Sequence, residues 1–289
     1  MRLLSLLSLL LLLNACHSSK LLELGSATAH KGIEVSQQAL HLYDMLDQQA
    51  EIDKQQQDEI KILTNPDPAK MKLPDTKRED FSAQLAPRIK AYSNMLKAYK
   101  AFALLSDKTH QQQSENAMTA LRNAYSDLDK LPNLPQPISQ KLPNLTGLLQ
   151  QSIHAGKVKK HHQILHSLTD LLVELWESDL STWEEYLDRI YNDYADAISA
   201  IGADKYAVKK ISDAAASPYA EDAVLIQLYR LKLRKSITAQ KNNLKNQLKQ
   251  FGKTLLELNL AHAELSKLKT NITLIEQSLY TLEQLLKQP

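Results

Sequence analysis

Histidines at helical spacing are the residues of this 289-residue chain whose type and pattern most directly suggest chemistry. His154, His162, His166 and Asp170 recur at multiples of four residues, so one helical face would present three imidazoles and a carboxylate. His162 and His166 together could bind Zn²⁺ or Cu²⁺, with Asp170 or His161 as a further ligand. Such pairs also occur on long helices that bind nothing, and no HExxH or cysteine cluster accompanies them. We therefore interpret this face as hydrated or partly buried and expect no resident metal.

The remaining sequence gives no sign of catalysis. It contains no P-loop, no GxSxG, no GxGxxG and no paired-carboxylate motif, so we do not expect an enzyme. His262 falls within an apolar repeat and is interpreted as an irregularity of the core. Trp176 and Trp183 are seven residues apart, a helical spacing that is more typical of a core than of an exposed recognition surface.

A single cysteine, Cys16, follows a leucine-rich run over residues 3–13 that is too short to span a bilayer as a helix. The segment Leu13-Asn14-Ala15-Cys16 resembles the lipobox of bacterial lipoproteins. The resemblance implies that residues 1–15 are a cleaved signal peptide and that Cys16 carries diacylglycerol and an amide-linked acyl chain such as palmitate. In that family, His17 in place of Asp implies the outer membrane, facing the periplasm.

The net charge of +2 gives no reason to expect nucleic acid as a partner. Only six glycines occur, and the apolar residues beyond the leader recur at steps of three and four. These features predict an all-α fold, an elongated helical bundle with long antiparallel helices of coiled-coil type. The predicted segments are a signal peptide (1–15), a lipidated start and short tether (16–25), an N-terminal helical segment (26–131), a proline-rich linker (132–143) and a long-helix hairpin (144–289).

Within the N-terminal segment we expect about three helices. The first covers residues 26–63, and the second opens at Thr76, which forms a capping-box pattern with Glu79. Pro87 predicts a kink or a later start of this second helix. A third helix is expected over residues 111–131.

In the C-terminal half, Ser217-Pro218 predicts the start of a final helix that reaches Lys287. From residue 244 onward its apolar positions form a heptad seam with one extra step of three between His262 and Leu268, which predicts a stammer in a coiled coil.

Two oppositely charged blocks suggest the partner of this helix. Residues 170–196 are acidic and residues 205–253 are basic, so a reversal near residue 210 would bring them face to face. In this hypothesis the carboxylates of residues 184, 185 and 188 lie opposite the cations of residues 230–235. Two solvated faces with unrelated charge remain the alternative, and another copy of the chain remains a possible partner for the seam.

Taken together, the sequence favours a non-catalytic envelope lipoprotein. The helical bundle would bind or brace another envelope protein, or would associate with itself, while the lipid on Cys16 holds it at the membrane. The alternative is a membrane-active helical protein, which resembles in outline the long-helix pore-forming toxins. The sequence does not identify the partner.

Overall fold

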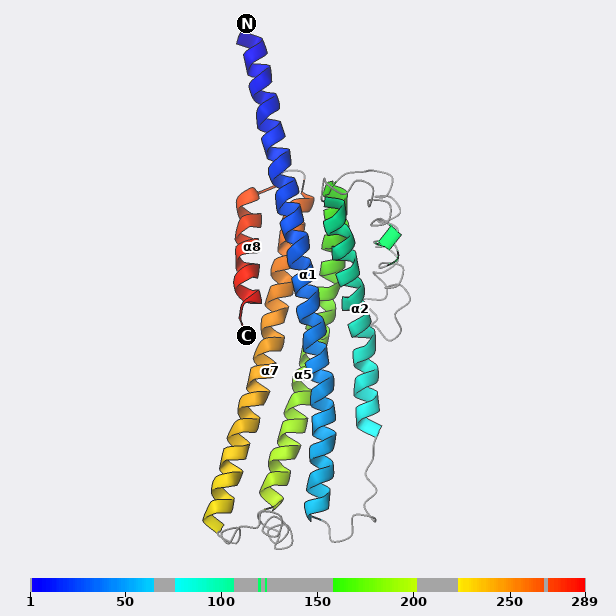
Figure 1. Cartoon of the computed structure of the whole chain (residues 1–289), viewed down its shortest axis with the longest axis vertical. Coiled ribbons are helices and arrows are strands. Elements are labelled where there is room, and N and C mark those ends of the chain that lie inside the picture. The colour runs from blue at the N-terminus through cyan, green and yellow to red at the C-terminus, as the bar shows by residue number, and fades with distance from the viewer. Residues whose placement is uncertain are drawn as a thin grey trace. The chain divides into compact units, whose positions relative to one another are not determined.

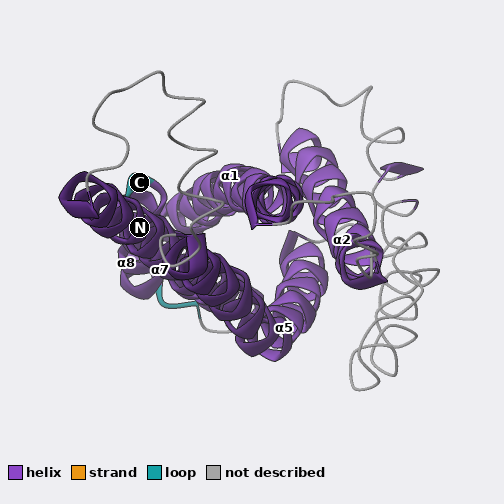
Figure 2. Ribbon diagram, turned by 90° about the horizontal axis from the view of Figure 1, so that it is seen from below, coloured by secondary structure: helices purple, strands orange, loops and turns teal. Residues whose placement is uncertain are grey.

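The computed structural model describes residues 2–64, 76–106, 119–120, 123, 158–201, 223–267 and 270–288. In these ranges all regular secondary structure is helical, and Figure 2 shows helices without any strand among them. The described helices are α1 (Arg2–Thr64), α2 (Thr76–Ser106), α5 (Val158–Ile201), α7 (Ala223–Ser266) and α8 (Ile272–Leu286) (Figure 1). The prediction of an all-α helical bundle is confirmed. The predicted linker over residues 132–143 lies outside the described residues. Of the third predicted helix, residues 111–131, the structure describes only residues 119–120 and 123, which are helical.

The chain divides into two compact units. Unit 1 comprises Met1–His41, Pro87–Ser178 and Gln250–Pro289, and unit 2 comprises Leu42–Ala86 and Asp179–Lys249. Helix α2 starts at Thr76 as predicted and continues through Pro87, where the division between the units falls. Proline has no N–H to donate to the preceding turn, so it removes a hydrogen bond from the helix interior.

Unit 1 is built around large aromatic side chains. Trp176 of α5 lies edge-to-face with Phe251 of α7 at 4.5 Å and with Tyr92 of α2 at 6.3 Å between ring centroids. Gly252 leaves room beside this packing, since a Cβ there would stand 3.2 Å from the Trp176 ring, a contact tighter than most. A Cβ on Gly32 of α1 would collide with the ring of Tyr99, so glycine allows close approach of two helices at this point too.

Unit 2 has an aromatic core of its own. Trp183 meets Tyr43 and Phe81 edge-to-face, with centroids 6.2 and 5.5 Å apart, and Phe81 stacks on Tyr186 at 3.6 Å. Trp183 is 0 % exposed, and Trp176 in unit 1 is 1 % exposed. The interpretation of both tryptophans as core residues is therefore confirmed.

Helices α5 and α7 run antiparallel in each unit. In unit 2, Asp188 contacts Lys241 and Lys245 at 3.2 and 2.8 Å, and Glu184 contacts Lys249 at 3.0 Å. The earlier residue of α5 therefore pairs with the later residue of α7, as in an antiparallel pair. The predicted register of the charged blocks was wrong by about four helical turns. The acidic side chains pair with lysines that follow residues 230–235, because the apolar residues of α5 and α7 set the alignment. Coiled-coil packing of these helices stays a prediction.

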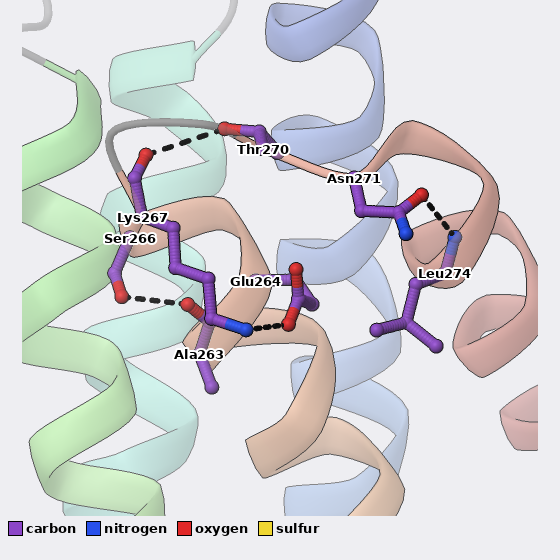
Figure 3. Close-up of polar contacts among 7 residues, drawn as sticks. All are labelled: Ala263, Glu264, Ser266, Lys267, Thr270, Asn271 and Leu274. Atoms are coloured by element: carbon purple, nitrogen blue, oxygen red, sulfur yellow. Dashed lines mark hydrogen bonds and ion pairs between the residues drawn. The ribbon is translucent and has the colours of Figure 1, made fainter.

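The prediction of one continuous helix to Lys287 was wrong. Helix α7 ends at Ser266. Asn271 is the N-cap of α8, and its side-chain oxygen accepts a hydrogen bond from the Leu274 N–H at 3.2 Å (Figure 3). The chain then folds back, since Gln250 of α7 donates to Gln288, just after α8, at 2.7 Å (Figure 1). The extra step of three that we interpreted as a stammer lies where the helix stops.

Local hydrogen bonds stabilise this corner. The Lys267 N–H donates to the Glu264 carbonyl at 3.2 Å, and the Lys267 ammonium pairs with the Glu264 carboxylate (Figure 3). The Ser266 hydroxyl donates to the Ala263 carbonyl at 2.7 Å. The two bonds to the Ala263 and Glu264 carbonyls satisfy acceptors that the end of a helix leaves without intrahelical partners.

The start of the folded body also differs from prediction. Helix α1 runs without a break through residues 16–25, which we expected to form a tether. Lys20 forms an ion pair with Glu276 of α8 at 3.2 Å, and Leu24 packs in a cluster with Leu265 and Ile275. The packed bundle therefore begins near Lys20, because α8 folds back and contacts Lys20 and Leu24.

Candidate functional site

A buried chain of ring side chains crosses unit 1. The Tyr99 hydroxyl of α2 lies 2.7 Å from Nε2 of His262 on α7, and Nδ1 of His262 lies 3.1 Å from Nδ1 of His162 on α5. Tyr99 and His262 are each 0 % exposed, and His162 is 1 % exposed. We refer to Tyr99, His162 and His262 as the buried ring triad.

Neighbouring side chains shape the triad from several helices. Phe102 of α2 lies edge-to-face on His162, with ring centroids 4.9 Å apart. On α1, a Cβ at Gly25 would stand 2.7 Å from Nε2 of His162, so only glycine leaves room for the imidazole there. The triad and its neighbours thus connect α1, α2, α5 and α7 within unit 1.

A second polar group lies nearer the surface of the same unit. His166 Nδ1 is 2.7 Å from the side-chain oxygen of Asn259, and the Asn259 amide donates to Asp170 at 3.3 Å. His166 is half-buried and Asp170 is exposed. A buried amide between two polar side chains satisfies the hydrogen-bonding groups that burial would otherwise leave without partners.

The predicted histidine face is thus divided between two groups of contacts. His162 forms a hydrogen bond with His262, whereas His166 and Asp170 both contact Asn259. His154 and the side chain of His161 lie outside the described residues. Within the part of the chain that the structure describes, no group of three or more His, Cys, Asp or Glu side chains is arranged to hold a metal ion.

Burial decides the charge of His262 and Tyr99. It holds the pKa of His262 well below its ordinary value of 6.5, and the nearby His162 and His166 lower that pKa further. Burial also raises the pKa of Tyr99, against a smaller opposing effect of a hydrogen bond with Thr169. His262 is therefore neutral at pH 7 and Tyr99 keeps its proton.

A neutral imidazole has one N–H and one acceptor nitrogen. If Tyr99 donates its hydroxyl proton to Nε2 of His262, then His262 donates from Nδ1 to His162. In the other tautomer both bonds reverse, and His162 is the donor to His262. Either arrangement satisfies the contacts on both sides of His262 without a buried charge.

Sequence analysis placed His262 in the core, and that interpretation is confirmed. It missed Asn259 and the role of Tyr99. A usable signal was present, since Tyr99 stands among the apolar positions of α2 and His262 stands on the apolar seam of α7. Polar groups at core positions of separate helices often form hydrogen bonds with each other, because an unpaired polar group is costly to bury.

Cys16 lies on the first part of α1, and its side chain lies outside the described residues. Lys20 is the first residue whose side chain the structure describes, four residues later. None of the described helices has a stretch that is both long and apolar enough to cross a membrane.

Comparisons with known proteins identify no relative of this chain. No family model matches the chain, and it has no match among curated proteins or solved structures. The class of protein that the structure defines is an all-α helical bundle.

Proposed function

We propose that the protein is a non-catalytic bacterial lipoprotein. In this proposal Cys16 is acylated after removal of residues 1–15, and the lipid holds the helical bundle at the outer membrane, facing the periplasm. The observation that carries the proposal is the segment Leu13-Asn14-Ala15-Cys16 at the end of a leucine-rich run.

The position of Cys16 relative to packed residues supports this function. Lys20 is paired with Glu276 and Leu24 is buried, so the bundle begins about one helical turn after the cysteine. A lipid on Cys16 would therefore hold unit 1 close to the bilayer surface. Two or three acyl chains make release from a membrane slow, because each buried methylene contributes about 0.8 kcal/mol.

The bundle itself would act as a binding or structural module. Its conspicuous polar groups are buried between helices, where the triad and Asn259 fix how α2, α5 and α7 meet in unit 1. Polar contacts of this kind help to specify one arrangement of a core, because they would be lost if the helices shifted. We therefore propose that the protein binds or braces another envelope protein, or a second copy of itself.

The anchor is tested by expressing the full chain and the variant Cys16→Ser in a Gram-negative bacterium. Incorporation of a clickable palmitate and the mass of the N-terminal peptide report acylation and cleavage. We expect the wild type to start at Cys16 with a lipid attached, and the variant to lose the lipid and leave the membrane fraction. Ser18→Ala, just outside the motif, should behave as the wild type.

Retention of the unacylated variant in the membrane with its leader intact would overturn the lipoprotein proposal and identify the leucine run as the anchor. Crosslinking in whole cells followed by mass spectrometry tests the second part. Envelope proteins or a second copy should be captured by the bundle. Leakage of vesicles caused by unacylated protein would instead favour the membrane-active alternative.

A further inference from the structure

One stretch of α7 in unit 2 exposes apolar and basic side chains together. Leu228 and Leu231 are 56 % and 52 % exposed, and Lys232, Arg234 and Lys235 are also exposed. We call these five residues the α7 basic face.

Helical geometry separates this face from the packed side of α7. Leu228, Leu231 and Lys235 are three and four residues apart and so share one side of the helix, with Lys232 and Arg234 on its two flanks. The other side carries Leu233, which is half-buried, and Ile237, which is 5 % exposed. The basic face therefore points away from the contacts that hold α7 in its unit.

The cations of this face were expected to pair with the acidic block of α5. The structure assigns that role to other lysines, because Asp188 contacts Lys241 and Lys245 while Glu184 contacts Lys249. Among the described residues, Lys232, Arg234 and Lys235 form no ion pair with a carboxylate. Their charge is therefore available to a partner.

Contact with α7 or α5 of a second copy of the chain is a poor match for this face. A symmetric contact through α7 would place the cations of one copy against those of the other. The acidic helix α5 offers charge, but among the residues whose exposure is described it has no exposed large hydrophobic side chain to cover Leu228 and Leu231. The partner must supply both anions and an apolar boundary.

We propose that the α7 basic face docks on the surface of an anionic lipid bilayer. The interfacial region of a bilayer accepts leucine side chains, while lysine and arginine reach outward to the lipid phosphates. Each basic residue near an anionic membrane contributes about a fivefold increase in binding at low salt. The contact is peripheral, and the opposite side of α7 stays packed in unit 2.

A local probe tests this contact in the full chain. The variant Cys16→Ser removes the only cysteine, and Ala239→Cys then gives one labelling site about three helical turns after Leu228, on the same side of α7. We expect an environment-sensitive fluorophore at this site to shift to the blue with phosphatidylglycerol vesicles and to stay unchanged with phosphatidylcholine vesicles. A label at Ser181→Cys, exposed on α5, should not respond.

Charge reversal supplies the matched control. The triple variant Lys232→Glu/Arg234→Glu/Lys235→Glu should weaken the response to anionic vesicles more than a hundredfold at low salt. The variant Lys90→Glu/Lys100→Glu/Lys253→Glu makes the same change of net charge at exposed positions elsewhere and should bind within a fewfold of the parent.

Equal loss in the two triple variants, an equal response to zwitterionic vesicles, or no response of the Ala239→Cys label would overturn the proposal. A response to an acidic amphipathic peptide without a response to vesicles would assign the face to a protein partner, and would also overturn it. The unacylated variant is used throughout, so this proposal and the acylation of Cys16 can fail separately.

Discussion

His162 and His262 face each other through Nδ1 atoms that lie 3.1 Å apart in the core of unit 1. Two neutral imidazoles can form this hydrogen bond, because one supplies the N–H and the other the acceptor. Two protonated rings would place donor against donor and charge against charge. The contact therefore makes the stability of the fold sensitive to acid.

We expect the free energy of unfolding to decrease as the pH falls below about 6.5. The pKa of His262 is lowered in the folded protein, so the unfolded chain binds a proton at a higher pH than the folded chain does. Stability from a neutral His262 is thus present above the ordinary value of 6.5 and declines below it, by at most about 1.4 kcal/mol per pH unit for one proton. Urea unfolding between pH 7.5 and pH 5 measures this slope.

The variant His262→Gln keeps a hydrogen-bonding side chain but removes the titration. It should be less stable at pH 7.5 by about 1–3 kcal/mol, because partners of His262 lose well-placed bonds in the core. Its slope between pH 6.5 and pH 5 should be smaller than that of the wild type. Identical slopes would show that His262 does not control the acid sensitivity.

Gly32→Ala should destabilise the protein. A Cβ at this position collides with the ring of Tyr99, and overpacking of a core typically costs about 1–3 kcal/mol. Gly252→Ala is the matched comparison, since its Cβ would stand 3.2 Å from Trp176 and needs only a small adjustment. Alanine gains about 1 kcal/mol of helix propensity at either site. If thermal unfolding ranked Gly252→Ala as the more damaging change, the described packing of Tyr99 would be wrong.

The register of α5 and α7 in unit 2 can be measured by charge reversal. Asp188→Lys should lower stability by about 1 kcal/mol or less, because the Asp188 side chain is 44 % exposed and surface ion pairs are weak. Adding Lys245→Asp should recover part of the loss. The recovery should shrink in high salt.

Two controls separate this register from the one predicted from sequence. Arg234→Asp in place of Lys245→Asp should give no recovery, and Glu185→Lys combined with Lys245→Asp should give additive effects. If stability recovered when Asp188→Lys was combined with Arg234→Asp but not with Lys245→Asp, the register predicted from the charged blocks would be correct.

Asn271→Ala should destabilise α8 by about 1 kcal/mol, since it removes the acceptor for the Leu274 N–H. Asn243→Ala, at an exposed position within α7, should be neutral or slightly stabilising, because alanine favours a helix interior. Hydrogen exchange of the α8 amides reports the difference directly. Equal protection in the two variants would mean that Asn271 does not cap the helix.

Helix content and the identity of many core residues could be predicted from the spacing of apolar residues. Trp176, Trp183 and His262 were all placed in the core on that basis. The same spacing could not show that the chain reverses after Ser266, because α7 and α8 both bury residues in unit 1, and their joined pattern mimics one interrupted repeat. Asn271, a residue with a high preference for helix starts, was the local signal for the break.

The polar groups were harder to predict than the apolar ones. Spacing placed His162 and His166 on one helical face, but their hydrogen-bond partners, His262 and Asn259, both lie on α7, a distant part of the sequence. Charge likewise predicted that α5 and α7 would pair without fixing the register, since surface ion pairs contribute little compared with apolar burial.

The ion pair between Lys20 and Glu276 also implies an order of events during synthesis. Chains emerge from their N-terminus, so Lys20 and Leu24 appear long before α8 exists to cover them. Contacts between such distant parts of a chain form late and slow folding. Until its last helix has been synthesised, the nascent protein therefore carries an uncovered apolar patch around Leu24, which a chaperone would have to shield.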